Sequence, residues 1–237
     1  MTTPKFERAR SAEAKQARET AILEAAARLG QQHGVRAVTL TDIAATVGMH
    51  KSAMLRYFET REEIFLRLAA DEWTQWSRDA RNRLGELGDV PPAEPETQPK
   101  TQSETPPETL IAAVARILAD SLVARPLFCD LLAHTPLNLE RGVSFAAVRS
   151  FKLVAIAEAG AVGAALGGIL RLTEEQGVNV VATATAMAGA LWQMAAPGTE
   201  LRRFYEDTPE LAHALVDVAP RLADILTALL TGYRRGR

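Results

Sequence analysis

Long segments of this chain repeat apolar residues with a period of about 3.6, and strand patterns are scarce. Ala, Leu, Glu and Arg fill these segments, whereas runs of β-branched residues with a period of two are missing. The longer period places apolar side chains on one face of an α-helix, and a half-buried strand needs the shorter one. The pattern therefore predicts an all-α protein.

Glycine and proline divide the chain into segments that predict two helical domains. We expect a flexible arm of mixed charge over residues 1–16, a small domain over 17–62 and a larger helical bundle over 63–237. Proline is frequent over residues 85–107, which predicts an exposed loop because proline cannot continue a helix. Helices are expected near residues 17–33, 60–84, 108–123, 127–134, 144–170, 173–196 and 209–233.

The small domain contains two short helices separated by a tight turn. Thr39 and Asp42 have the spacing of a capping box, which predicts that a helix starts there. Gly48 interrupts the pattern, and a third helix is expected over residues 50–58. The arrangement predicts a helix-turn-helix over residues 38–58.

The third helix has a core side and a solvent side. Met54 and Phe58 are four residues apart and face the core, so the opposite side is left for solvent. Its small or long side chains can enter a major groove about 12 Å wide, where Arg56 can donate two hydrogen bonds to guanine and Ala53 can contact a thymine methyl. An ordinary amphipathic helix would show the same pattern, so this helix alone leaves both interpretations open. The residues on the solvent side are Lys51, Ser52, Ala53, Leu55 and Arg56.

Positive charge is concentrated near the N-terminus. Residues 1–58 contain nine Lys or Arg and five Asp or Glu, a net charge of +4, so the total of −2 leaves −6 for the remainder. A basic end on an acidic body is typical of a phosphate-binding domain joined to a soluble module, although a chance fluctuation of charge would produce the same asymmetry.

The segment from Thr39 to Glu63 resembles the DNA-binding domain of the tetracycline repressor-like (TetR) family of bacterial regulators. The similarity extends over about residues 17–68 and rests on Ile43-Ala44, Gly48, the Tyr57-Phe58 pair and Arg61. It implies a sequence-specific transcriptional regulator, in particular a repressor released from its operator by a small-molecule effector.

The resemblance also implies roles for individual side chains. Residues that would face bases are Thr41, Lys51, Ser52, Ala53 and Arg56, and residues that would hold phosphates are Thr39, Tyr57 and Arg61. The sequence departs from the family pattern twice. Leu55 stands where the family usually has Tyr, so a polar contact is replaced or lost. His50, also expected at the DNA, stands at the N-cap usually held by Ser and caps more weakly.

A homodimer on a pseudo-palindromic operator follows from the same resemblance, because one short helix contacts too few base pairs for useful specificity. The last two helices are expected to form the dimer interface, although core packing within one chain would explain the same apolar residues. The candidates are Ala182, Ala186, Gly189, Ala190, Leu215, Val218, Leu222, Ile225 and Leu229.

The body of this family usually encloses a small-molecule site. Plain core packing is the alternative for each aromatic candidate. The expected wall and polar residues are Trp73, Trp76, Phe128, Leu131, His134, Phe145, Phe151, Arg149, Trp192 and Gln193.

Other classes of function have weaker support in the sequence. Glu210 and His213 have the Glu-x-x-His spacing of carboxylate-bridged metal sites, but only once, and no hydrolase elbow or phosphate loop is present. A single cysteine excludes an internal disulfide. We therefore expect that the protein is not an enzyme and needs no cofactor or metal. We expect a cytoplasmic location, and we interpret residues 153–170 as a buried bundle helix instead of a membrane span. A helical adaptor that binds only protein is the remaining alternative.

Overall fold

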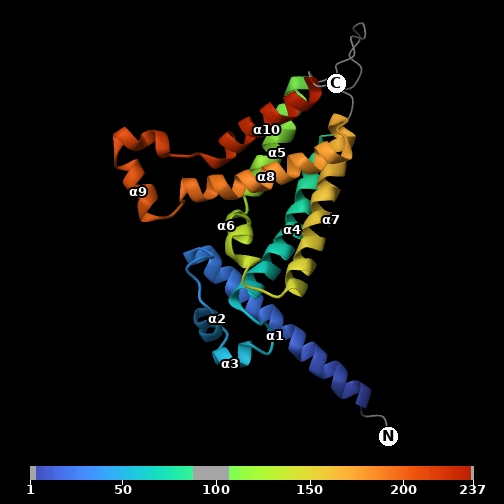
Figure 1. Cartoon of the computed structure of the whole chain (residues 1–237), viewed down its shortest axis with the longest axis vertical. Helices are drawn as coiled ribbons and strands as arrows, with labels where there is room; N and C mark the ends of the chain where they lie inside the picture. The colour runs from blue at the N-terminus through green and yellow to red at the C-terminus, as the bar shows by residue number, and fades with distance from the viewer. Residues whose placement is uncertain (1–3, 88–106, 236–237) are drawn as a thin grey trace, which may run out of the picture.

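The computed structural model describes residues 4–87 and 107–235, and all regular structure within these ranges is helical (Figure 1). This confirms the all-α prediction. The N-terminal helices are α1 (Pro4–His33), α2 (Leu40–Thr46), α3 (Lys51–Met54) and α4 (Arg61–Glu86). Next come α5 (Pro107–Val123), α6 (Pro126–His134), the π-helical turn η1 (Thr135–Leu139), α7 (Phe145–Leu170) and α8 (Glu174–Ala195). The last are α9 (Glu200–Glu206), the 3₁₀ turn η2 (Pro209–Ala214) and α10 (Val218–Arg235).

The small N-terminal domain consists of α1, α2, α3 and the start of α4. Ile22 and Ala26 of α1 are fully buried, as are Ile43 of α2, Met54 of α3 and Ile64 of α4. Figure 1 shows α2 and α3 beside α1 at one end of the molecule. The three-helix arrangement expected for this domain is therefore present.

The first helix is longer than expected, since it begins at Pro4 instead of Ala17. Proline fits the first turn of a helix, and the Ala, Glu, Lys and Arg residues that follow are strong helix formers. Lys15 and Glu19 also form an ion pair at 3.7 Å along this helix. The segment expected as a flexible arm over residues 1–16 is thus helical from Pro4 onward, and Figure 1 shows it extending beyond the rest of the domain.

Helix α4 joins the two domains, because it runs from the small domain into the body. In the body α7 packs along α4, α10 packs against α5 and α8, and α8 also packs against α6 and α7. Trp76 of α4, Leu118 of α5 and Phe128 of α6 are fully buried between these helices. Each amphipathic helix gains most of its stability by burying its apolar face in this shared core.

Helix α7 is buried on one side only. We expected a buried bundle helix over residues 153–170, and α7 does pack along α4 and α8, but Leu153 and Ile156 are exposed. Its glycines allow a close crossing, because a Cβ on Gly163 would lie 2.9 Å from the backbone of Gly177 in α8. Among the described helices, α7 is the one long and apolar enough to match a membrane span by length and composition.

The C-terminal segment differs most from expectation. We expected one helix over residues 209–233, but η2 ends at Ala214, Leu215 is extended and α10 begins at Val218. Pro220 explains the break, because a proline inside a continuous helix removes one hydrogen bond and clashes with the preceding turn. The short helix α9 was not expected. Neither α9 nor η2 contains a buried residue, and Figure 1 shows α9 projecting from the body.

Helix α4 ends at Glu86 and α5 begins at Pro107. Most of the proline-rich loop expected over residues 85–107 therefore lies outside the described residues.

Candidate nucleic-acid interface and effector site

A capping box fixes the start of α2. The Thr39 side chain accepts a hydrogen bond from Asp42 N at 3.2 Å, and the Asp42 carboxylate accepts one from Thr39 N at 2.8 Å. The predicted capping box is confirmed. The hydrogen bonds from the side chain and backbone of Thr39 lower the pKa of Asp42, so its carboxylate is ionised at neutral pH and favours the N-terminus of α2. Met54 and Phe58 are buried as expected, which turns the opposite side of α3 outward.

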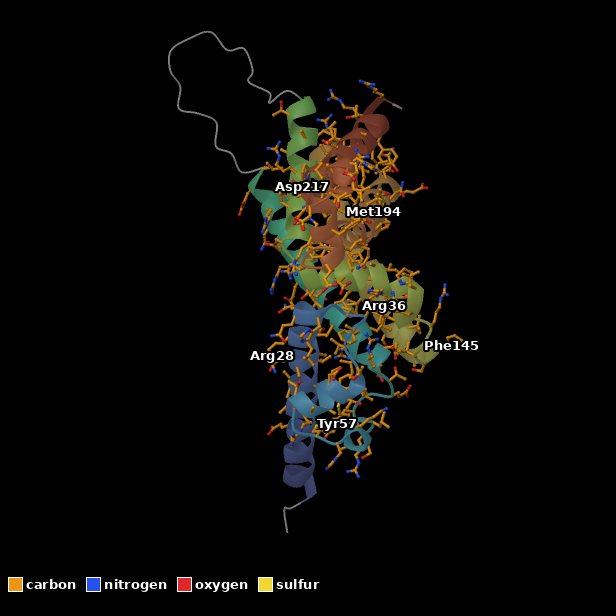
Figure 2. All side chains as sticks on the ribbon, turned by 90° about the vertical axis from the view of Figure 1, so that its left-hand side faces the viewer. Arg28, Arg36, Tyr57, Phe145, Met194 and Asp217 are labelled. Atoms are coloured by element: carbon orange, nitrogen blue, oxygen red, sulfur yellow. The ribbon has the colours of Figure 1, made fainter. Side chains whose placement is uncertain are left out.

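The outward side of α3 carries the polar side chains expected at DNA. Lys51, Ser52 and Arg56 are exposed, and Ala53 is half-buried beside them. Within the described residues, none of these side chains forms a hydrogen bond to another part of the chain. Figure 2 shows the neighbouring Tyr57 near the same end of the molecule. Their contacts with DNA remain predictions. Such contacts require exposed side chains, and this surface provides them. The other exposed candidates nearby are Thr39, Thr41 and His50.

The two departures from the family pattern have visible consequences. His50 is the N-cap of α3 and makes no side-chain capping bond, as its imidazole led us to expect. Leu55 is 50% exposed, so an apolar side chain stands on the surface next to Arg56. Helix α3 also ends at Met54, earlier than expected, and turns continue to Tyr57. Specificity must therefore come from a short polar surface.

Arg61 is held inside the domain. Its Nε donates to the carbonyl of Val38, its Nη2 donates to the carbonyl of Val35, and its Nη1 lies 2.9 Å from the Glu62 carboxylate. The guanidinium also lies over the ring of Phe65, 4.7 Å from its centroid. A phosphate contact from Arg61 remains a prediction, but it would have to compete with these bonds.

The body residues expected to line an effector site are distributed over separate places. Trp73, Trp76 and Phe128 pack edge to face or tilted, with ring centroids 5.5 to 6.0 Å apart, and Leu131 is fully buried beside them. The indole of Trp76 donates to Ser121 Oγ at 3.0 Å. These rings fill space in the core and so support the core interpretation.

Two other candidates lie on the surface of α7. Phe145 is 93% exposed, and Arg149 is exposed one turn further along the helix. Figure 2 shows Phe145 at the edge of the molecule. They do not share a site with the buried tryptophans, because the N-terminal part of α7 turns this side away from α4. Phe151, by contrast, is buried against α4.

His134 and Gln193 come together at a residue that the sequence did not indicate. Gln193 Nε2 donates to the carboxylate of Asp130 at 2.8 Å, and His134 Nε2 lies 3.5 Å from the same oxygen. Trp192 lies beside this cluster in a cavity of about 370 Å³. The spacing of Asp130 and His134 on one helix face was a usable signal, but Gln193 is 63 residues away.

A second cavity lies where α7 crosses α4 close to the small domain. It measures about 380 Å³ and has apolar walls from Leu66, Ala70, Phe151 and Val154. Phe58, the last residue of the helix-turn-helix, also lines it. This cavity therefore contacts both domains.

The dimer candidates divide into two groups. Val218, Leu222 and Gly189 pack inside the chain's own core, and a Cβ on Gly189 would lie 2.8 Å from the backbone of Ala133 in α6. This corrects the expectation that they face a partner. Leu215, Ile225 and Leu229 are half-buried.

The outer side of α8 is exposed and is not covered by another helix among the described residues. Ala182, Ala186 and Ala190 are exposed there, and Val178 and Met194 extend the stripe at spacings of four residues. Val178 and Met194 were missed, although the spacing of four was a sequence signal for them. Five exposed apolar residues thus follow one line along α8.

Comparisons with known proteins cover both domains. Residues 22–68 match the model for bacterial regulatory proteins of the tetR family, and residues 70–237 match that for the tetracyclin repressor-like C-terminal domain. A comparison with curated proteins gives no match.

A solved structure with the same fold is that of a fatty acid degradation regulator, FadR, from Bacillus halodurans. It is 13% identical, with a TM-score of 0.50, over 88% of this chain and 94% of that one. FadR from Thermus thermophilus, a TetR family repressor in complex with lauroyl-CoA, is 17% identical, with a TM-score of 0.46, over 84% and 95%. A TetR/AcrR family regulator from Thermobifida fusca is 18% identical, with a TM-score of 0.46, over 92% and 100%. Because the two family models together match nearly the whole chain, this protein belongs to the TetR family of bacterial transcriptional regulators.

Proposed function

We propose that this regulator is a homodimeric repressor that a small molecule releases from a pseudo-palindromic operator. The observation that carries the proposal is the outward side of α3, where Lys51, Ser52 and Arg56 are exposed and free of described bonds within the chain. Long basic side chains and small hydroxyls are suited to base edges in the major groove. Met54 and Phe58 are buried on the opposite side and hold this surface outward without using any of these side chains.

The need for two copies follows from the size of the surface. Helix α3 has four residues, whereas a specific protein–DNA interface buries on the order of 1,000 Å² or more of protein surface. We place the second copy on the outer side of α8, where Val178, Ala182, Ala186, Ala190 and Met194 form the exposed stripe. Small side chains let two such helices approach closely.

We assign the effector to the cavity between α4 and α7. An apolar ligand could contact Leu66, Phe151 and Val154, while Arg67 and Asp71 at the rim would orient a polar group. Because Phe58 forms part of the wall, a ligand here would press on the helix-turn-helix directly. That contact supports release of the operator by occupancy of this cavity.

Selection of bound genomic fragments tests DNA recognition. Purified protein is incubated with fragmented genomic DNA, bound fragments are sequenced, and affinity is measured at 50 and 200 mM salt. We expect one enriched sequence with two-fold symmetry, and an affinity that falls steeply with salt because phosphate contacts release counterions. A protein-only adaptor would enrich no fragment and show no dependence on salt, and that outcome would refute the proposal.

A pair of neighbouring substitutions tests the effector site without a known ligand. Ala147 lines the cavity, whereas Ala146 is exposed beside it. Ala147→Phe would fill the cavity and is expected to weaken binding to the selected fragment, while Ala146→Phe leaves it unchanged. Equal affinities for both variants would exclude this cavity as the site of release.

A further inference from the structure

The turn after α1 needs an acceptor from outside the small domain. Gly34 ends α1 with a positive φ of 80°, and its N–H bonds back to Gly30 at 2.9 Å. The next residue, Val35, is fully buried, so its N–H has no access to water. A buried N–H without a partner is costly, and the acceptor it finds therefore matters for the position of the turn.

That acceptor is a carboxylate of the body. Asp130, in the middle of α6, accepts a hydrogen bond from Val35 N at 2.6 Å, across 95 residues of sequence. Its side chain is 13% exposed, which strengthens the bond by excluding water. Burial raises the pKa of Asp130, but the hydrogen bonds from His134, Val35 and Gln193 together outweigh burial and lower the pKa below its ordinary value. The carboxylate is therefore ionised and binds the turn by a charge-assisted hydrogen bond.

The same turn is tied to α4 from its other side. The carbonyls of Val35 and Val38 accept hydrogen bonds from Arg61, at the start of α4. The peptide groups around Val35 are thus held by Asp130 through the N–H and by Arg61 through the C=O. This turn leads directly into α2 and α3, so its position sets the position of the DNA-facing helix.

The second oxygen of Asp130 connects the turn to the proposed dimer helix. Gln193, near the end of α8, donates to it at 2.8 Å and is adjacent in sequence to Met194 of the exposed stripe. The cavity of about 370 Å³ lies beside this cluster, between α1, α6 and α8. Side chains therefore do not pack closely between α1, α6 and α8, and the hydrogen bonds of Asp130 connect the small domain to the body beside this cavity. Figure 2 shows Arg36, one residue beyond Val35, at the level where the small domain meets the body.

We propose that Asp130 is a positioning residue for DNA recognition, which links α8 to the turn after α1 and so fixes the distance between the two DNA-binding domains of a dimer. The inference rests on the proposed dimer and extends it by naming the link between the dimer helix and the helix-turn-helix. Removing this link should let each DNA-binding domain tilt on its body, and the dimer should then accept half-sites at more than one spacing.

The test uses the genomic fragment that the wild-type protein selects and versions of it with one base pair added or removed between the half-sites. The wild-type protein should prefer the natural spacing by a large factor. Asp130→Ala should bind the natural spacing about tenfold more weakly, which corresponds to a loss of roughly 1.4 kcal/mol of binding free energy. It should also lose most of its preference between spacings, whereas Asp120→Ala, an exposed control on α5, should keep both properties.

Two further variants separate positioning from simple loss of stability. Asp130→Asn keeps one acceptor for Val35 N and should restore most of the spacing preference. Gln193→Met changes an exposed side chain and removes only the hydrogen bond between α8 and Asp130. It should reduce the spacing preference, while the unfolding midpoint of the body in urea stays unchanged. Unchanged spacing preference in both Asp130→Ala and Gln193→Met would overturn the inference. If the wild-type protein selects no two-fold symmetric fragment, the proposed function fails first, and the two failures are thus distinguishable.

Discussion

The DNA-binding domain and the body use apolar residues differently. In the small domain α2 and α3 each have one buried side and one polar, exposed side, and the buried Ile43 and Met54 mark the side that faces the core. In the body α7 and α8 carry apolar residues on both sides: Gly163 and Gly177 meet at the crossing, whereas Ile156 and Ala186 face outward. A polar surface on a short helix therefore indicates its role directly. An apolar residue on a long helix indicates only that it contacts something.

This difference predicts three kinds of effect, according to where a substitution lies. Changes in the core of the body should unfold the protein, changes on the outer side of α8 should separate the subunits, and changes on α3 should alter recognition alone. Five measurements test that order.

The largest loss is expected from Trp76→Ala in the body. Trp76 is fully buried and packs on Trp73 and Phe128, so its removal leaves a cavity and should cost about 3–5 kcal/mol of unfolding free energy. Urea denaturation followed by circular dichroism measures the loss. Trp192→Ala, at a half-buried position, should lose clearly less. Similar losses would mean that the aromatic cluster is loosely packed.

A charge on α8 should separate the dimer. Ala186→Glu places a carboxylate near the middle of the exposed stripe, and a symmetric interface would contain it twice, at a cost of about 2 kcal/mol or more. Sedimentation velocity should show monomers at concentrations where the wild-type protein is dimeric. Ala124→Glu, at an exposed position before α6, is the matched control. A dimer that survives Ala186→Glu would place the interface elsewhere.

Arg56→Ala tests the DNA-facing surface itself. The exposed guanidinium of Arg56 should contribute about 1–3 kcal/mol at one base position, so its loss should relax specificity there. Affinities for the cognate site and for single-base variants measure this effect. Arg61→Ala should instead weaken binding to all sequences alike. Equal losses of Arg56→Ala on cognate and scrambled DNA would show that Arg56 contacts only the backbone.

A smaller effect is expected from the cap of α2. Thr39→Ala removes the acceptor for Asp42 N and should cost about 1 kcal/mol of stability. Thr39→Ser keeps the hydroxyl and should stay close to the wild-type melting temperature in a thermal scan. Loss of stability in both variants would point to the methyl group of Thr39 instead of its oxygen.

The smallest effect on stability at neutral pH is expected from ionisation of Cys129. Burial, with the nearby charges of Asp130 and Glu72, raises the pKa of the Cys129 thiol to about 12. The thiol is neutral in both the folded and unfolded states below about pH 8, so it affects stability only in alkali. Above that pH the unfolded state releases the proton first, and stability falls as pH rises. A thiol reagent at pH 8 should label Cys129 in urea but not in buffer, and labelling of the native protein would contradict its burial.

Individual residues show how far the sequence could predict the site. Thr39, Asp42, Met54 and Phe58 have their expected roles, because capping and helix periodicity act over three or four residues. Arg61 has a side-chain environment that no local pattern contains, since its acceptors are 23 and 26 residues away. Contacts at that separation depend on how the helices pack.

The body shows the same limit more strongly. Helices over residues 107–123, 126–134, 145–170 and 174–195 lie close to where their apolar period, caps and breaks placed them. Their partners could not be derived in this way. Leu222 and Ala186 both lie on apolar faces, yet Leu222 fills the chain's own core and Ala186 is exposed.

The sequence by itself determined the helical class, the helix-turn-helix and the polar side of α3, because short-range hydrogen bonds and a helix period specify them. The tertiary structure alone decided that Gln193 reaches Asp130, that Arg61 is bonded within the domain, and which apolar residues remain exposed. The physical reason is that burial of apolar surface is non-directional. It favours any good packing of amphipathic helices, and only the completed fold selects which faces are covered.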